Sequence, residues 1–142
     1  MMRIFLDTNI LLDVLVPDRL SASSSSMIFE QVKKGSLEAF IVTQSIVDMY
    51  YISSHYAVRK EEADRLTQWL LAFINIRSID TFDLRAALKM DSSDFEDNTL
   101  LAHAESEQCD IFVTNDREIL TRKNLDPLKI MSPEQFVQTM KL

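Results

Sequence analysis

Short apolar runs alternate along this chain with longer segments of helical periodicity. The short runs, each bounded by polar or turn-forming residues, predict strands at residues 3–6, 39–42, 76–79, 110–114 and 129–131. The longer segments predict helices at residues 10–16, 21–34, 43–56, 60–74, 81–90 and 94–107, and another from Ser132 onward. This alternation predicts an α/β domain in which helices surround a mostly parallel sheet.

Start and stop signals support these boundaries. Pro17 and Asp18 end the first helix, and Gly35 follows the last turn of the second. Ser132 and Pro133 form a strong helix start. Because no internal repeat or linker interrupts the chain, we expect residues 1–142 to form a single domain.

Polar residues follow two of the predicted strands. Asp7, Thr8 and Asn9 come directly after the first strand, and Thr114 and Asp116 lie at the end of the fourth. Ligands of open α/β sheets bind outside the carboxyl ends of the strands. These side chains are therefore candidates for a functional site.

Two predicted helices add further carboxylates. Asp48 stands in a largely apolar segment and shares one helical stripe with Ser45 and His55. Asp94 and Asp97 lie on one stripe at the start of a later helix. An acid in apolar surroundings needs hydrogen-bond donors or a cation, because burying a bare charge is very unfavourable.

The composition removes several kinds of site. A single glycine, Gly35, cannot build a glycine-rich phosphate loop of the Rossmann or Walker type. Two isolated histidines, His55 and His103, are too few for a histidine-rich zinc centre. Any functional site must therefore use carboxylate, hydroxyl or amide side chains.

The net charge and the lack of targeting features bear on the ligand class and on the cellular location. A net charge of −7 argues against a nucleic-acid ligand, but setting aside five proposed site acids leaves 17 acidic against 15 basic residues. Residues 1–6 lack the pattern of a secretory leader, and the apolar run at 69–74 is too short to cross a membrane. With Cys109 as the only cysteine, we expect a soluble cytoplasmic protein without membrane association.

Carboxylates that converge in one cleft repel one another unless a cation neutralises them. An all-oxygen set suits the hard ions Mg²⁺ and Mn²⁺. Such ions support hydrolysis of phosphodiesters, because they bind the phosphate and activate water.

The site residues lie in four segments, at 4–13, 43–52, 94–98 and 110–116. In this order and spacing, which cover nearly the whole chain, they resemble the PIN-domain nucleases, especially the toxin-like ribonucleases of the VapC type from prokaryotic toxin–antitoxin pairs. The resemblance implies a three-layer fold whose sheet has about five strands in the order 3-2-1-4-5. It further implies a Mg²⁺ or Mn²⁺ cofactor and endonucleolytic cleavage of single-stranded or structured RNA.

The resemblance also assigns roles to individual residues. The implied metal ligands are Asp7, Asp94, Asp97 and Asp116. The implied catalytic acids are Asp7, Asp48, Asp97 and Asp116, supported by Thr8, Asn9, Ser45 and Thr114 as positioning or substrate-facing groups. A small antitoxin partner and a homodimer are implied as well. The chain departs from the family pattern at Asp48, where Glu is frequent, and at Asn98, where a small residue is usual.

Other interpretations of the pattern stay open. One is a non-catalytic PIN-like module that binds RNA or protein. Another is a Mg²⁺-dependent phosphotransferase or phosphatase of the haloacid-dehalogenase type, although that chemistry uses a second aspartate where Asn9 stands. A receiver-type signalling domain would need a lysine site that the chain does not clearly contain. Taken singly, each acid could also be a helix cap or turn residue.

Overall fold

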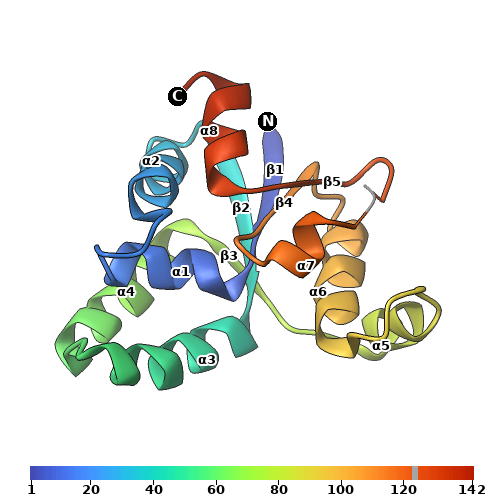
Figure 1. Ribbon diagram of the computed structural model, residues 1–142, viewed down its shortest axis with the longest axis horizontal. Coiled ribbons are helices and arrows are strands. Elements are labelled where there is room, and N and C mark those ends of the chain that lie inside the picture. Colours follow the sequence, from blue (N-terminus) through green and yellow to red (C-terminus); the bar gives the residue numbers. More distant parts are fainter. Residues whose placement is uncertain (123–124) are drawn as a thin grey trace.

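A parallel sheet forms the middle layer of the protein, here described from a computed structural model that covers residues 1–122 and 125–142 (Figure 1). All its neighbouring strands run parallel, in the order β3-β2-β1-β4-β5. The strands are β1 (Met2–Leu6), β2 (Leu37–Val42), β3 (Asn75–Arg77), β4 (Ile111–Val113) and β5 (Lys129–Met131). The predicted α/β fold and its strand order are confirmed.

Helices cover one face of the sheet over the larger of two hydrophobic cores. They are α1 (Thr8–Leu15), α2 (Ala22–Lys33), α3 (Thr43–Ser53), α4 (Lys60–Phe73) and α8 (Pro133–Met140). Ile4, Leu6 and Ile41 point from the sheet into this core and are fully buried. Alternation along β1 sends the intervening Phe5 to the opposite face.

The second face carries fewer helices and an aromatic core. Its helices are α5 (Thr81–Leu88), α6 (Phe95–Ser106) and the short α7 (Arg117–Leu120). Phe5 and Phe112 stack there with ring centroids 5.2 Å apart, against Leu101 of α6 and Ile119 of α7. Because β1, β2 and β4 are covered on both faces, they appear in the sequence as largely continuous apolar runs.

A few predicted boundaries move. The third strand was expected at residues 76–79 but spans Asn75–Arg77, because the chain leaves the edge of the sheet at Ser78 and Asp80 already caps α5. The helix expected at residues 43–56 ends as an α-helix at Ser53 and finishes in a 3₁₀ turn, Ser54–Tyr56. Helix α7 was not predicted, because one turn is too short to show periodicity.

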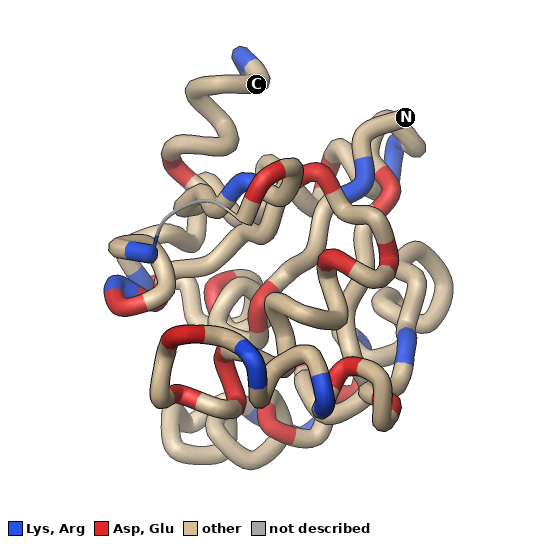
Figure 2. Tube along the Cα trace, turned by 90° about the vertical axis from the view of Figure 1, so that its right-hand side faces the viewer, with Lys and Arg blue, Asp and Glu red and all other residues tan. Residues whose placement is uncertain are grey.

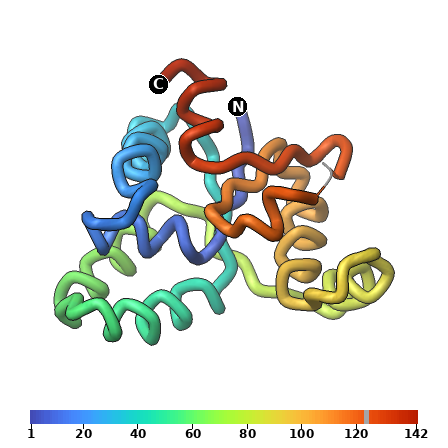
Figure 3. Tube along the Cα trace, viewed as in Figure 1, coloured from blue at the N-terminus to red at the C-terminus, as the bar shows by residue number. Residues whose placement is uncertain are grey.

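Both chain ends lie at the same end of the molecule, on the side where β1 begins (Figure 3). The carboxyl ends of the strands, where Asp7 and Asp116 stand, face the other way. Within the described residues, no helix has both the length and the apolar character needed to cross a membrane.

A buried hydrogen bond between an aspartate and a histidine fastens α5 to α6. Asp83 accepts hydrogen bonds from the backbone N–H of Asp80 at 3.2 Å, from His103 Nδ1 at 2.8 Å and from Ser106 Oγ at 3.3 Å. Asp83 and His103 are both buried. This carboxylate therefore serves a capping box and a contact between two helices at once.

We expect Asp83→Ala to lower the free energy of unfolding by about 3 kcal/mol, because it leaves the buried His103 without its partner. Chemical denaturation measures this change. Asp80→Ala is the matched control, since it removes only the N-cap and is expected to lower stability by about 1 kcal/mol. Equal losses in the two variants would contradict a special role for the buried pair.

Candidate metal centre

An acidic cleft of about 320 Å³ opens at the carboxyl ends of the strands. It is lined by Asp7, Thr8, Asn9, Leu12, Asp48, Ile52, Asp94, Glu96, Asp97, Leu100 and Asp116. All five predicted aspartates therefore meet in one place, although they come from four separate segments of the chain. We refer to the hollow lined by all these residues as the acidic cleft.

Asp7 lies at the floor of the acidic cleft, where β1 passes into α1. Its side chain is buried and caps α1 by accepting a hydrogen bond from the Thr8 backbone N–H at 2.8 Å. Its backbone N–H donates to the Val113 carbonyl at 3.0 Å, which ties the end of β1 to the end of β4. The cap and the strand pairing together fix the position of this carboxylate.

Thr114 links Asp7 to the backbone of Asp116. Its hydroxyl donates a hydrogen bond to Asp7 Oδ2 at 2.7 Å. The oxygen of this hydroxyl, Thr114 Oγ1, accepts a hydrogen bond from the Asp116 backbone N–H at 3.0 Å. The side chain of Thr114 is fully buried. Asp116 in turn caps α7 by accepting from the Glu118 backbone N–H at 2.9 Å.

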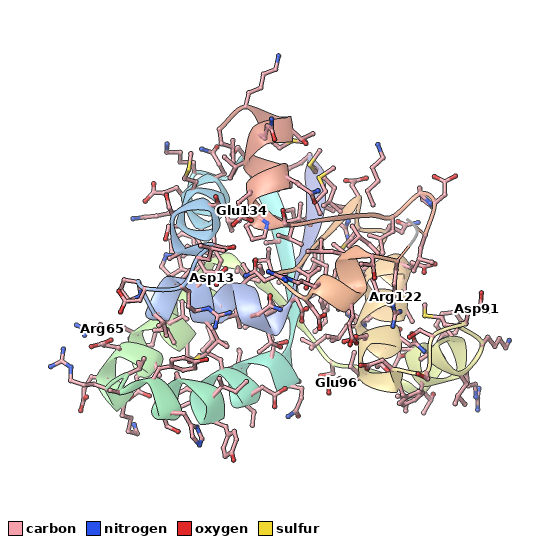
Figure 4. The ribbon with its side chains drawn as sticks, in the orientation of Figure 1. Asp13, Arg65, Asp91, Glu96, Arg122 and Glu134 are labelled. Atoms are coloured by element: carbon pink, nitrogen blue, oxygen red, sulfur yellow. The ribbon has the colours of Figure 1, made fainter. Side chains whose placement is uncertain are left out.

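Asn9 connects the cleft to a buried polar network behind it. Its amide nitrogen lies 3.5 Å from Asp7 Oδ2, and its Oδ1 accepts from the Asn115 backbone N–H at 3.1 Å. Asn115 Nδ2 donates to Asp13 at 2.7 Å, and Asp13 also accepts from Arg19 Nε at 2.8 Å. Asp13 is almost completely buried between α1 and α2 (Figure 4). The network fixes the loop that carries Asp116.

The start of α6 forms the opposite wall. Asp94 caps this helix by accepting from the Asp97 backbone N–H at 3.0 Å. Carboxylate oxygens of Asp94, Asp97 and Glu118 all lie within 4.8 Å of one another, close enough to share one cation. This trio contains two residues expected from the sequence and one that was not.

Asp48 and the hydroxyls lie on the α3 side. Asp48 is partly exposed and accepts a hydrogen bond from Gln44 Nε2 at 2.9 Å, one helical turn earlier. Thr8 donates its hydroxyl to Ser45 Oγ at 2.9 Å, which joins the first turns of α1 and α3. Ser45 is buried beside the acidic cleft and does not line it.

Comparison with known proteins identifies the family. A model of the PIN domain matches residues 3–118. The chain belongs to the PIN-domain family. A search of functionally curated proteins finds no matching sequence.

Solved structures share the fold at low identity. A chain of the VapBC2 complex of Rickettsia felis, bound to a DNA fragment from its promoter, is 18% identical with a TM-score of 0.63, over 92% of this chain and 98% of that one. VapC20 of Mycobacterium tuberculosis, described as a Sarcin-Ricin loop cleaving toxin, is 10% identical with a TM-score of 0.65, over 81% of this chain and 91% of that one. A chain of a toxin–antitoxin complex from Klebsiella pneumoniae is 17% identical with a TM-score of 0.62, over 91% of this chain and 96% of that one.

Two aspartates that line the acidic cleft of this PIN domain have raised pKa values. Burial raises the pKa of Asp7 from 3.8 to about 6, against the hydrogen bonds from Thr114 and Thr8, with a further rise from the charges of Asp116 and Glu96. The pKa of Asp97 rises from 3.8 to about 7, first through burial and then through the charges of Asp94, Asp116 and Asp7. Without a cation, the acidic cleft therefore disfavours full ionisation.

Two carboxylates at or beside the acidic cleft were not predicted from the sequence. Glu96 lines the acidic cleft, and Glu118 belongs to the trio with Asp94 and Asp97. Both stand in the first turn of a helix, where acids are common without any site, so neither was distinctive. Their proximity to Asp94 and Asp116 along the sequence was the one available indication.

Residues set aside at the sequence level stay outside the acidic cleft. His55 is exposed and its Nδ1 lies 3.0 Å from the Tyr51 carbonyl oxygen. Cys109 is buried in the aromatic core, and burial raises the pKa of its thiol to about 12, so it is a poor nucleophile at neutral pH.

We expect the metal-free protein to become less stable as the pH rises. Asp7 and Asp97 have folded-state pKa values of about 6 and about 7, above the ordinary 3.8, so the folded state binds more protons between about pH 4 and 7. The melting temperature in a chelator should therefore fall between about pH 4 and 7. Asp97→Asn should flatten this dependence and melt higher than the native protein at pH 8. If the melting temperatures of the native protein and Asp97→Asn depended on pH in the same way, the raised pKa of Asp97 would not be the cause.

We expect Thr114→Val to weaken Mn²⁺ binding at least tenfold, because it removes the hydroxyl shared by Asp7 and Asp116 and leaves both groups without that partner. Calorimetric titration with Mn²⁺ measures the affinity. Thr114→Ser keeps the hydroxyl and should bind within about threefold of the native protein. A serine variant as weak as the valine variant would show that packing, rather than the hydrogen bonds, matters.

Proposed function

We propose that this PIN-domain protein is a Mg²⁺- or Mn²⁺-dependent endoribonuclease and the toxin of a toxin–antitoxin pair. The observation that carries the proposal is the convergence of Asp7, Asp48, Asp94, Asp97 and Asp116 in one cleft. Helix caps or turn residues need not meet in space, so the single-residue explanations do not account for this arrangement.

The donor set fits a hard divalent cation. Asp7, Asp94, Asp97 and Asp116 would hold it, and the raised pKa values of Asp7 and Asp97 reflect repulsion and burial that a cation would offset. A bound Mg²⁺ or Mn²⁺ would supply charge neutralisation at the scissile phosphate and a more acidic water. Glu118 lies close enough to Asp94 and Asp97 to contribute an oxygen.

The protein's own residues would orient the substrate and the acids. Thr114 and Asn9 hold Asp7 and the Asp116 loop in place, and Asp48 projects from α3 toward the same cleft. Thr8 lines the cleft with a hydroxyl that can also accept a hydrogen bond from a ribose. Hydrolysis adds the water hydroxyl to phosphorus and its proton to the leaving O3′, which yields a 5′-phosphate and a 3′-hydroxyl.

The similar solved structures support the substrate class and the partner. One of them is described as a loop-cleaving toxin, and the other two come from toxin–antitoxin complexes. By extension, we propose cytoplasmic RNA as substrate, a small antitoxin as partner and a homodimer as the assembly. Basic and acidic positions are interspersed along the chain (Figure 2), and the chain has 22 acidic against 15 basic residues, so RNA binding would depend on the bound cation.

The test is cleavage of a mixed-sequence RNA by the purified protein with Mg²⁺ or Mn²⁺. We expect Asp7→Asn and Asp97→Asn to reduce the rate at least 100-fold, because each removes a charged ligand of the cation. Asp18→Asn, which alters an exposed acid just after α1, should cleave at the native rate.

The products should carry 5′-phosphate ends, detectable by their sensitivity to a 5′-phosphate-dependent exonuclease. Equal cleavage by the native protein and both cleft variants would point to a contaminant and sink the proposal. A native protein that binds RNA without cutting it would favour the non-catalytic binding module.

A further inference from the structure

A second hollow, the side pocket, opens directly beside the acidic cleft. It has a volume of about 400 Å³ and is lined by Thr8, Val42, Gln44, Ser45, Asp48, Ile79, Phe95, Glu96, Thr99 and Leu100. Thr8, Asp48, Glu96 and Leu100 belong to both hollows. Figure 4 shows Glu96 in the space between the starts of α3 and α6. A chain bound across the acidic cleft would therefore have its next group within reach of the side pocket.

The walls of the side pocket suit a flat aromatic ligand. Phe95 is 44% exposed, although it stands in the first turn of a helix that packs on the sheet. Val42, Ile79 and Leu100 supply further apolar surface. An exposed ring beside a small apolar hollow offers a surface on which a nucleobase can stack. A volume of about 400 Å³ is within the range of small-molecule sites.

Several polar groups of the side pocket can accept hydrogen bonds. Gln44 uses Nε2 to donate to Asp48, which leaves its amide oxygen to accept. Thr8 donates its hydroxyl to Ser45, and Thr99 donates its hydroxyl to the Phe95 carbonyl at 2.8 Å. Within the described part of the chain, Glu96 makes no hydrogen bond or ion pair, so both its oxygens are available.

The charge of the side pocket determines which part of a nucleotide fits. Asp48 and Glu96 border it, and none of the described basic residues lines it, so a phosphate would be repelled. A neutral base with N–H groups on its edge would pair with these acceptors. Guanine presents N1–H and the N2 amino group side by side, which matches the two oxygens of one carboxylate. Uracil offers a single N–H donor on that edge.

We propose that the side pocket is a nucleobase subsite that holds a base next to the cleaved phosphodiester, with Phe95 as the stacking surface and Glu96 favouring guanine. This assignment rests on the proposed function for its biological meaning. Phe95 and Glu96 are specificity-determining residues in this scheme, and the aspartates of the acidic cleft carry the reaction.

The experiment measures binding of two fluorescently labelled single-stranded RNA oligonucleotides by anisotropy, with Ca²⁺ replacing Mg²⁺ to suppress cleavage. One oligonucleotide contains uridine only, and the other carries one central guanosine. We expect the native protein to bind the guanosine oligonucleotide about tenfold more tightly. Phe95→Ala should lose about tenfold in affinity for this RNA, whereas Phe95→Tyr, which keeps an aromatic ring, should stay within about twofold.

Two further variants separate the contributions. Glu96→Gln should reduce the guanosine preference to less than about threefold while binding of the uridine oligonucleotide stays unchanged or improves. Phe82→Ala is the matched control, because Phe82 is an exposed phenylalanine on α5 that lines a different hollow. It should bind both oligonucleotides as the native protein does. Thermal unfolding of each variant checks that it is folded.

The subsite is overturned if Phe95→Ala binds like the native protein, if Phe82→Ala loses as much affinity, or if the native protein binds neither RNA. It is also overturned if Glu96→Gln keeps the full preference. Cleavage with Mg²⁺ is assayed separately. Binding through Phe95 without cleavage would support the subsite and refute the nuclease, whereas cleavage with binding indifferent to Phe95 would do the reverse.

Discussion

The gathering of carboxylates in a partly desolvated cleft is the constraint on which the rest of this structure depends. Burial raises the pKa values of Asp7 and Asp97, and neighbouring charges raise them further, those of Asp116 and Glu96 at Asp7 and those of Asp94, Asp116 and Asp7 at Asp97. A protein tolerates such an arrangement when the scaffold holds the acids firmly and a cation offsets their charge. The scaffold is visible in the structure, and the cation is part of the function that we propose for the acids.

The scaffold holds the acids in two ways. The doubly covered parallel sheet fixes the ends of β1 and β4 side by side, which sets the separation between Asp7 and the Asp116 loop. Polar contacts then hold the side chains, chiefly the Thr114 hydroxyl and the link from Asn9 through Asn115 to the buried Asp13. The acids are therefore oriented before any ligand binds, which reduces the reorganisation needed on binding.

The sequence predicted most of the fold because the central strands β1, β2 and β4 are buried on both faces and stand out as short apolar runs. Asp7 and Asp116 could be placed because each directly follows a strand. Bringing Asp94 and Asp97 to them depended on the resemblance to a family, since no local pattern shows where α6 crosses the sheet. The hydroxyl of Thr114 was assigned a supporting role, but its simultaneous contact with two acids is a matter of side-chain geometry.

What the sequence did not reveal has common physical causes. Helix α7 is a single turn, and β3 is a short edge strand whose limits are set by where α5 is capped. Glu96 and Glu118 look like ordinary acids at helix starts until the packing of α6 and α7 brings them to the cleft. The acidic net charge, which argued against a nucleic-acid ligand, is in part a property of this one site.

Titration with Mn²⁺ followed by electron paramagnetic resonance tests the central claim most directly, because it detects the ion without requiring catalysis. At pH 8 the native protein should bind Mn²⁺ in the acidic cleft, and Asp97→Asn should weaken that binding at least tenfold. Absence of Mn²⁺ binding, or equal binding by the two proteins, would contradict the account.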